Sequence, residues 1–346
     1  MPKKKWIYFA VSTAVSLVLL LILLAQIRIR DLVQALENIY RPALGAYVAI
    51  ALGTVWLRAL RYRRLLRPEP ISWKNVLLVT FVRNGFEDLL PARLGSLSYV
   101  YVLDRILGYS LETAASTFVV AMALDLMTLG PFLILAIGFV GFGTAEISGP
   151  LLFAGAVGYF GLMALLLWKI VPVMNVCLKI YQRALRAFRV DRDLPARRSV
   201  DKFKLIIRSL EQIRNRRTYP ALFGLSLAIR LGKYLALYAL LFAILRNSGF
   251  ALTWLNFWKT ILGISGAELT AFMPLKGIAD VGTWASAWTI AFTLMKFDLK
   301  LAVISGLGVH AITNLFEYTL ALAALATLAI LKKAGRLRRP APPPAV

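Results

Sequence analysis

The chain has 346 residues, of which 59% are hydrophobic and 17% charged, and its formal net charge is +24. Soluble domains are about 45–50% apolar and about 25% charged, so this composition excludes a soluble globular protein and predicts an integral membrane protein. A single cysteine and a single histidine exclude a disulfide framework and a multi-histidine or thiolate metal site. No cofactor is expected. No basic-aromatic motif typical of nucleic-acid binding is present, so anionic lipid is the expected partner of the positive charge.

Apolar runs of about 17–25 residues, long enough to cross a bilayer, follow one another along the chain. The first run follows three lysines and lacks a small-residue cleavage site, so we expect a retained span rather than a signal peptide. We expect six full spans, at 6–27, 43–60, 113–142, 150–171, 220–245 and 301–331. Two further apolar stretches, 73–107 and 253–298, are interrupted by glycine, proline and charged residues.

The distribution of lysine and arginine predicts the orientation of the spans. Six basic residues, including Arg58 and Arg61, lie between 58 and 74 against one acid, and thirteen lie in 172–219 against four acids. The tail 332–346 adds five basic residues without an acid, and its richness in proline and alanine predicts disorder. Both termini and the basic segment 172–219 are therefore expected to be cytoplasmic.

If every basic segment is cytoplasmic, the stretches 73–107 and 253–298 must each return to the face they left. They are then two re-entrant hairpins that enter from opposite faces. The stretches also match each other: Trp73, Asn75, Gly85 and Glu87 correspond to Trp254, Asn256, Gly266 and Glu268, and Pro91-Ala-Arg93 lies two residues out of register with Pro274-Leu-Lys276. Inverted repeats with broken helices are a transporter signature. We therefore expect an all-α polytopic membrane bundle, residues 1–331, with two inverted repeats that each contain a broken-helix hairpin.

Three runs carry a resemblance to a known family: RALRYRRLL at 58–66, NGFEDLLPARLG at 84–95 and GIADVGTWASAW at 277–288. They resemble the flippase-like membrane family that includes the transmembrane region of lysylphosphatidylglycerol synthase, the multiple peptide resistance factor. The resemblance covers about 6–331. It implies lipid translocation between leaflets, with aminoacylated phosphatidylglycerol as the best-known cargo, in a prokaryotic inner membrane. The synthase carries a soluble aminoacyl-transfer domain after its spans; we expect no such lipid synthesis here.

The chain departs from this family at two places. After the first hairpin the family often has Glu-Arg-x-x-Asp, whereas 121–125 here retains only Asp125. After the second hairpin many members have Gly-x-Tyr-Glu, whereas 282–285 here reads Gly-Thr-Trp-Ala. Both departures remove carboxylates that a charge-coupled cycle could use.

Ionisable groups inside a bilayer cost about 2.5–3.5 kcal/mol each, so they persist where they are paired or face a wet cavity. Arg93 directly follows the break at Pro91, where its guanidinium could bind a phosphate with two parallel hydrogen bonds. Structural pairing with Asp88 is the alternative, and Arg83 could pair with Glu87, four residues along a helix. The predicted headgroup-binding residues are Arg93, Lys276, Asn84, Glu87, Asp88, Glu268 and Asp280.

Three further polar residues lie inside predicted spans. Asp125 lies near Pro131, in a run that we expect to be too long for one straight helix. It is either a cavity-lining group or proton carrier, or a hydrogen-bond partner for broken backbone. His310 and Glu317 are seven residues apart and share a helical face, which fits a proton relay or, alternatively, a histidine satisfied by packing.

The predicted function is that of a lipid translocase, a flippase or scramblase, without enzymatic activity. The cargo would be a phospholipid, an aminoacylated phospholipid or a polyprenyl-phosphate-type lipid. No nucleotide-binding loop is present, so a gradient, a partner or no energy source would drive the movement. Two alternatives stay open: a membrane-embedded transferase that acts on lipid-linked substrates, and a non-transporting partner of a separate lipid synthase. A homo-oligomer also stays open.

Overall fold

The computed structural model describes residues 3–66, 71–87, 89, 95–144, 158, 161, 169–187, 197, 199–201, 203–208, 219–269 and 281–335. Regular structure in this part of the chain is helical throughout, as the sequence predicts. Its elements are α1 (Lys3–Ala25), α2 (Ile29–Glu37), α3 (Arg41–Leu65), α4 (Trp73–Glu87), α5 (Ser98–Tyr101), a π-helical turn (Val102–Ile106), α6 (Leu111–Thr144), α8 (Ile170–Ala187), α10 (Tyr219–Leu245), a 3-10 turn (Arg246–Ser248), α11 (Trp254–Leu269), α12 (Val281–Leu294) and α13 (Leu299–Lys333).

Several of these helices are long and apolar enough to cross a membrane. The described part of the chain has four such helices, within α3, α6, α10 and α13. Helices α1 and α2 meet at a bend of 83° and would add a fifth span if together they form one broken span. The protein is therefore an integral membrane protein with several spans. Most of the predicted span 150–171 lies outside the described residues, and so does the tail from residue 336.

Helix α3 continues past the predicted end of its span at residue 60, as far as Leu65. Arg58 and Arg61, which the orientation argument counts as loop charges, lie inside this helix, and Arg61 is fully buried. Counting these two arginines as loop residues was wrong. They lie in a helix because neighbouring helices supply hydrogen-bond acceptors for them, and a count of basic residues does not consider such acceptors. Arg63 and Arg64 also lie in α3, in its last turn, and Lys74 lies in α4.

Helix α6 runs from Leu111 to Thr144 with Pro131 inside it. The run that was expected to be too long for one straight helix is one continuous helix of 34 residues. Proline removes one backbone hydrogen bond, and in a membrane helix neighbouring side chains can compensate for that loss. The carbonyl that loses its backbone partner to Pro131 is that of Met127, four residues earlier. Thr128 and Arg230 donate hydrogen bonds to a nearby carbonyl oxygen, that of Asp125, six residues before the proline.

The two stretches predicted to be broken hairpins each contain two helices. Helices α4 and α5 occupy the first and pack against each other, and α11 and α12 do so in the second. The chain folds back at once after the first break, since a Cβ atom at Gly95 would collide with the carbonyl oxygen of Phe86. This close approach requires glycine at the end of the Pro-Ala-Arg-Leu-Gly run. The residues from 90 to 94 and from 270 to 280 lie outside the described part.

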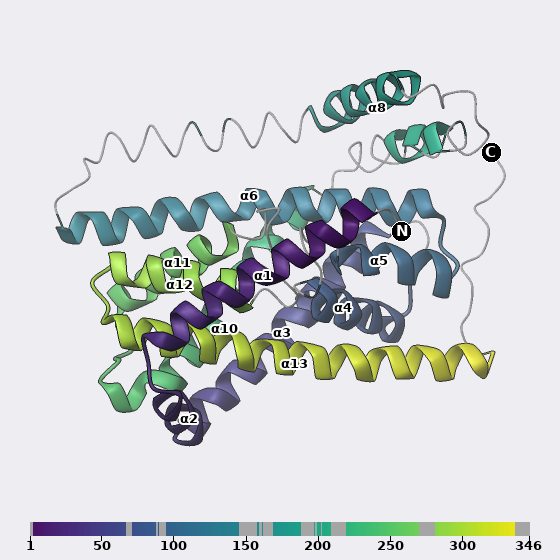
Figure 1. Cartoon of the computed structure of the whole chain (residues 1–346). Coiled ribbons are helices and arrows are strands. Elements are labelled where there is room, and N and C mark those ends of the chain that lie inside the picture. The colour runs from purple at the N-terminus through teal and green to yellow at the C-terminus, as the bar shows by residue number, and fades with distance from the viewer. Residues whose placement is uncertain are drawn as a thin grey trace.

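The helices are arranged along one long direction (Figure 1). The start of α1 and the end of α13 lie toward one end of the molecule, which we call the N-terminal end, and α2 lies at the other, the α2 end. The pair α4 and α5 lies toward the N-terminal end, whereas the pair α11 and α12 lies toward the α2 end. The long helices α6 and α13 extend past both pairs.

Each of these long helices contacts both pairs. Helix α6 packs against α5 near its own start, where Tyr99 and Thr117 share a hydrogen bond of 3.1 Å, and against α11 through Phe139 near its end. Helix α13 packs against α12 near its start and against α4 in its second half. Gly85 makes the latter contact possible, because a Cβ atom there would collide with Ala321 and lie 2.7 Å from the carbonyl oxygen of Glu317.

Helices α3 and α10 form another extensive interface. At their crossing, a Cβ atom at Gly232 would lie 2.6 Å from the hydroxyl of Thr54. We expect Gly232→Ala to lower the free energy of unfolding by about 1 kcal/mol, because the hydroxyl must move and loses its place in a close-packed crossing. Denaturant titration in detergent micelles measures this change. Adding Thr54→Ala should recover most of it, and a double variant as unstable as the single one would contradict the assignment.

Buried apolar side chains gather in two clusters, one around α4 and α5 and one around α11 and α12. Helices α6, α10 and α13 each contribute to both clusters at different points along their length. Between those points they carry polar residues: Asp125 and Thr128 on α6; Ser226, Arg230 and Lys233 on α10; His310, Asn314 and Glu317 on α13. With Arg58 and Arg61 of α3, these residues form a polar layer between two apolar ends.

Candidate functional site

Arg61 and Asp125 form an ion pair that joins α3 to α6. One guanidinium nitrogen of Arg61 lies 2.6 Å from a carboxylate oxygen of Asp125, and the other lies 3.2 Å from the second oxygen. Arg61 also donates to the hydroxyl of Ser226 on α10, at 2.9 Å. A guanidinium matches a carboxylate in this two-point geometry. Arg61 and Asp125 therefore join three helices, and the Asp125 carboxylate binds a side chain rather than the broken backbone of the structural alternative. Its role as a proton carrier stays a prediction.

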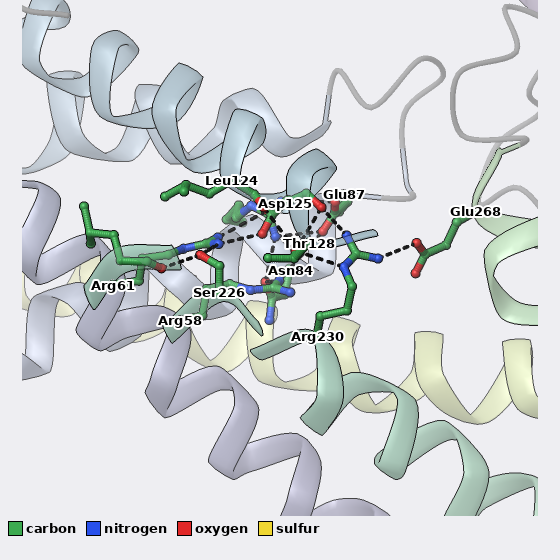
Figure 2. Close-up of polar contacts among 12 residues, drawn as sticks. Arg58, Arg61, Asn84, Glu87, Leu124, Asp125, Thr128, Ser226, Arg230 and Glu268 are labelled. Carbon is green, nitrogen blue, oxygen red and sulfur yellow. Dashed lines mark hydrogen bonds and ion pairs between the residues drawn. The ribbon is translucent and has the colours of Figure 1, made fainter. Parts of the chain in front are cut away.

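Arg230 connects α10 to α6 and α11 (Figure 2). Its guanidinium donates to Thr128 and to the carbonyl oxygen of Asp125 on one side and to Glu268 on the other, at 3.0 Å. Lys233, almost one turn further along α10, lies 2.7 Å from the other carboxylate oxygen of Glu268. The end of α11 is thus held by two cations from the preceding long helix.

The end of α4 is held differently. Glu87 pairs with Arg83 of its own helix, at 2.8 and 3.1 Å, which confirms the predicted pair four residues apart. Arg58 of α3 donates to the side-chain oxygen of Asn84 at 2.6 Å and lies 3.9 Å from Glu87. The buried Nε of Arg58 has no hydrogen-bond partner within the described residues.

A cavity opens within the polar layer. The empty space between its lining side chains amounts to about 1120 Å³, including its open mouth. The lining comes from α3, α4, α10, α11, α12 and α13, so both halves of the chain contribute. The charged residues that line it are Arg58, Glu87, Lys233, Glu268 and Glu317, and the aromatic ones are Tyr47, Phe81, Trp284 and Phe316. A pocket in which a few polar groups from several helices converge is the usual form of a ligand site.

His310 lies in the wall of this cavity and is almost entirely buried. Its ring stacks on Trp284 with centroids 4.9 Å apart, and its Nε2 lies 3.0 Å from the side-chain nitrogen of Asn314. These contacts favour the interpretation of a histidine satisfied by packing, although Glu317 lines the same cavity as expected from their shared face.

The cavity brings together half of the candidate residues. Asn84, Glu87, Glu268, His310 and Glu317 all line it. Asp125 does not line it, and its carboxylate points to Arg61 instead. Arg93, Asp88, Lys276 and Asp280 lie outside the described residues, so their assignment to a headgroup site stays a prediction.

The sequence argument missed the cations of α3 and α10. Arg58 and Arg61 were read as topology signals, and Arg230 and Lys233 were not considered. A signal was present, since α3 carries Arg58-x-x-Arg61-Tyr62 and α10 carries the similar Arg230-x-x-Lys233-Tyr234. A cation within an apolar run costs free energy to insert into the bilayer, and such residues are usually functional or paired. Both patterns could therefore have been identified as candidate site residues.

Among the described residues of the polar layer and of the ends of α4 and α11, five cations accompany four carboxylates. The cations are Arg58, Arg61, Arg83, Arg230 and Lys233, and the carboxylates are Glu87, Asp125, Glu268 and Glu317. Within the described residues, no group of three histidine, cysteine or acidic side chains is placed to hold a metal ion.

The geometry is that of a helical membrane domain with a polar cavity between its two ends, and the comparison with protein families agrees. The family model of the lysylphosphatidylglycerol synthase TM region matches residues 9–330. The chain belongs to this family. Membership extends over nearly the whole chain, including every residue of the polar layer. No curated protein matches the chain, and no solved structure does so either.

Proposed function

We propose that this protein is a lipid translocase that moves the headgroup of a phospholipid-type lipid through the polar layer while the acyl chains stay in the bilayer. The observation that carries the proposal is the cavity between the two apolar ends, lined by charged side chains from both halves of the chain. A charged headgroup crosses hydrocarbon at high cost. Fixed charges and hydrogen-bond donors at mid-depth replace its lost hydration and lower that cost.

The lining offers partners for both signs of charge. Arg58 and Lys233 line the cavity, and both are suited to phosphate oxygens. Glu317 and the ring of Trp284 are suited to an ammonium group, through charge and through cation–π attraction. An aminoacylated phospholipid carries both groups, while a phospholipid or polyprenyl phosphate would use the cations alone. Arg93 and Lys276, which lie in the segments after α4 and α11, are proposed to bind the same phosphate group.

The helix contacts support an inverted repeat of α3–α6 and α10–α13. Helix α4 packs on α13, and its counterpart α11 packs on α6, which is the counterpart of α13. Helix α3 packs on its own counterpart, α10. The broken pairs lie toward opposite ends of the molecule, in keeping with re-entrant hairpins that enter from opposite faces of a prokaryotic inner membrane, with both termini cytoplasmic (Figure 1).

Translocation in proteoliposomes tests the proposal. Purified protein is reconstituted with fluorescent phosphatidylglycerol or its lysyl derivative, and the lipid that reaches the other leaflet is quantified. We expect headgroup-selective movement that falls about tenfold or more in Arg58→Gln and in Lys233→Gln, because each loses a charge-assisted contact worth about 1.5–3 kcal/mol. Arg93→Ala and Lys276→Ala test the predicted phosphate site in the same assay. Lys179→Gln, an exposed change on α8, is the matched control and should move lipid at the wild-type rate.

Folded wild-type protein that moves no lipid would refute the proposal. Turnover of a lipid-linked substrate by the same preparation would then favour the membrane-embedded transferase. Co-purification with a lipid-synthesising enzyme, without transport, would favour the non-transporting partner.

A further inference from the structure

Two glutamates occupy matching positions at the ends of the first helices of the broken pairs. Glu87 is the last residue of α4, and Glu268 is the penultimate residue of α11. Both lie at the same distance in sequence from the tryptophan that begins their helix, Trp73 or Trp254. Both also line the central cavity. The two helices therefore present the same group to the same space from opposite ends of the molecule.

Each glutamate faces an arginine from the long helix that precedes it. Arg58 of α3 lies 3.9 Å from Glu87, and Arg230 of α10 lies 3.0 Å from Glu268. Both arginines begin the Arg-x-x-Arg/Lys-Tyr pattern shared by α3 and α10. The chain thus contains two versions of one arginine–glutamate contact, one in each half.

The two versions differ in how tightly they are made. Glu268 is held by both Arg230 and Lys233, and its side chain is 9% exposed. Glu87 is 21% exposed and lies 2.8 Å from Arg83 on its own helix but 3.9 Å from Arg58, which binds Asn84. The arginine–glutamate contact between α10 and α11 is therefore short, whereas the one between α3 and α4 is longer.

We propose that these two contacts are alternating gates: Glu268 with Arg230 and Lys233 closes the cavity toward the α2 end, and Glu87 with Arg58 closes it toward the N-terminal end. The present structure has the first gate closed and the second relaxed. In the opposite state Arg58 moves from Asn84 onto Glu87, while Glu268 leaves α10. A repeat whose halves exchange conformations alternates access in this way without any other moving domain. This inference rests on the proposed lipid translocation, for which the two gates would open the cavity to one face of the membrane and then to the other.

Side-specific labelling of a cavity cysteine tests the gates without measuring transport. Cys177 is the only cysteine in the chain, so Cys177→Ser gives a cysteine-free background. Thr313→Cys then places one thiol in the cavity wall on α13. A membrane-impermeant maleimide is applied to either face of oriented vesicles, and the two labelling rates are compared. The variants are Glu268→Gln and Glu87→Gln, with the exposed Asp201→Asn as control.

We expect Glu268→Gln to raise the ratio of labelling from the α2 side to labelling from the N-terminal side by about fivefold or more, the usual lower range of a conformational coupling. Glu87→Gln should lower the same ratio, and Asp201→Asn should leave it unchanged. If Glu268→Gln does not fold, Arg230→Gln opens the same gate and should shift the ratio in the same direction. If Glu268→Gln and Glu87→Gln change the labelling ratio in the same direction, or if neither changes it in folded protein, the proposed gates are overturned. Opposite shifts in a protein that moves no lipid would uphold the gates and refute the translocase.

Discussion

Replacing Arg61 with methionine is expected to lower the free energy of unfolding by about 3–5 kcal/mol, the usual cost of removing one partner of a buried ion pair. Arg61 is fully buried and holds Asp125 by two contacts and Ser226 by a third. Methionine fills a similar volume but leaves the carboxylate of Asp125 without its counter-charge inside the bundle. Titration with a denaturing detergent in mixed micelles measures the difference between the wild type and the variant.

The double variant Arg61→Met, Asp125→Leu distinguishes the contribution of the ion pair from the cost of leaving one buried charge without its partner. Replacing both partners with apolar residues removes the desolvated charges together, so its stability should return to within about 1–2 kcal/mol of the wild type. A double variant that is as unstable as the sum of the two single variants would show that the pair is not what stabilises this region.

A leucine at position 85 is expected to cost more than about 3 kcal/mol and to separate α4 from α13. The Cβ atom alone would collide with Ala321 and crowd the carbonyl oxygen of Glu317 at 2.7 Å, and both belong to a helix that cannot yield locally. Overpacking typically costs about 1–3 kcal/mol, and this contact involves backbone on both sides. Gly85→Ala should therefore already cost about 1–3 kcal/mol, as thermal unfolding in detergent would detect.

Gly53 provides the matched control for Gly85. It also lies within a membrane helix, but a Cβ atom there would meet nothing within 4 Å. Gly53→Ala should leave the protein unchanged or stabilise it by up to about 1 kcal/mol, because alanine restricts the unfolded chain and favours helix. Equal losses at both positions would argue against a specific α4–α13 contact.

Hydropathy predicted most of the helices because a bilayer imposes a length and an apolar composition on anything that crosses it. The breaks in 73–107 and 253–298 were also predictable, since glycine, proline and charge interrupt those runs. Pro131 lies inside a continuous helix and does not end it. Local sequence does not contain that information.

The candidate site was predictable only from the residues that looked out of place in apolar sequence. Glu87, Glu268, His310 and Glu317 stood out in this way, and all four line the cavity. Arg58 did not, because it sits beside a basic loop and the topology rule already explained it. Its role depends on Asn84, which only the packing of α3 against α4 brings within hydrogen-bond distance.

The interleaving of the two halves bears on how the chain is made. Ser16 of α1 accepts a hydrogen bond from the backbone of Gly282, so α1 packs on a helix that is synthesised 266 residues later. Helices α3 and α4 likewise pack on α10 and α13. During synthesis the early helices must therefore remain in the lipid without their final neighbours. Assembly of the bundle is then a late and cooperative event, and a fragment that stops before α10 lacks most of the surfaces that would hold it together.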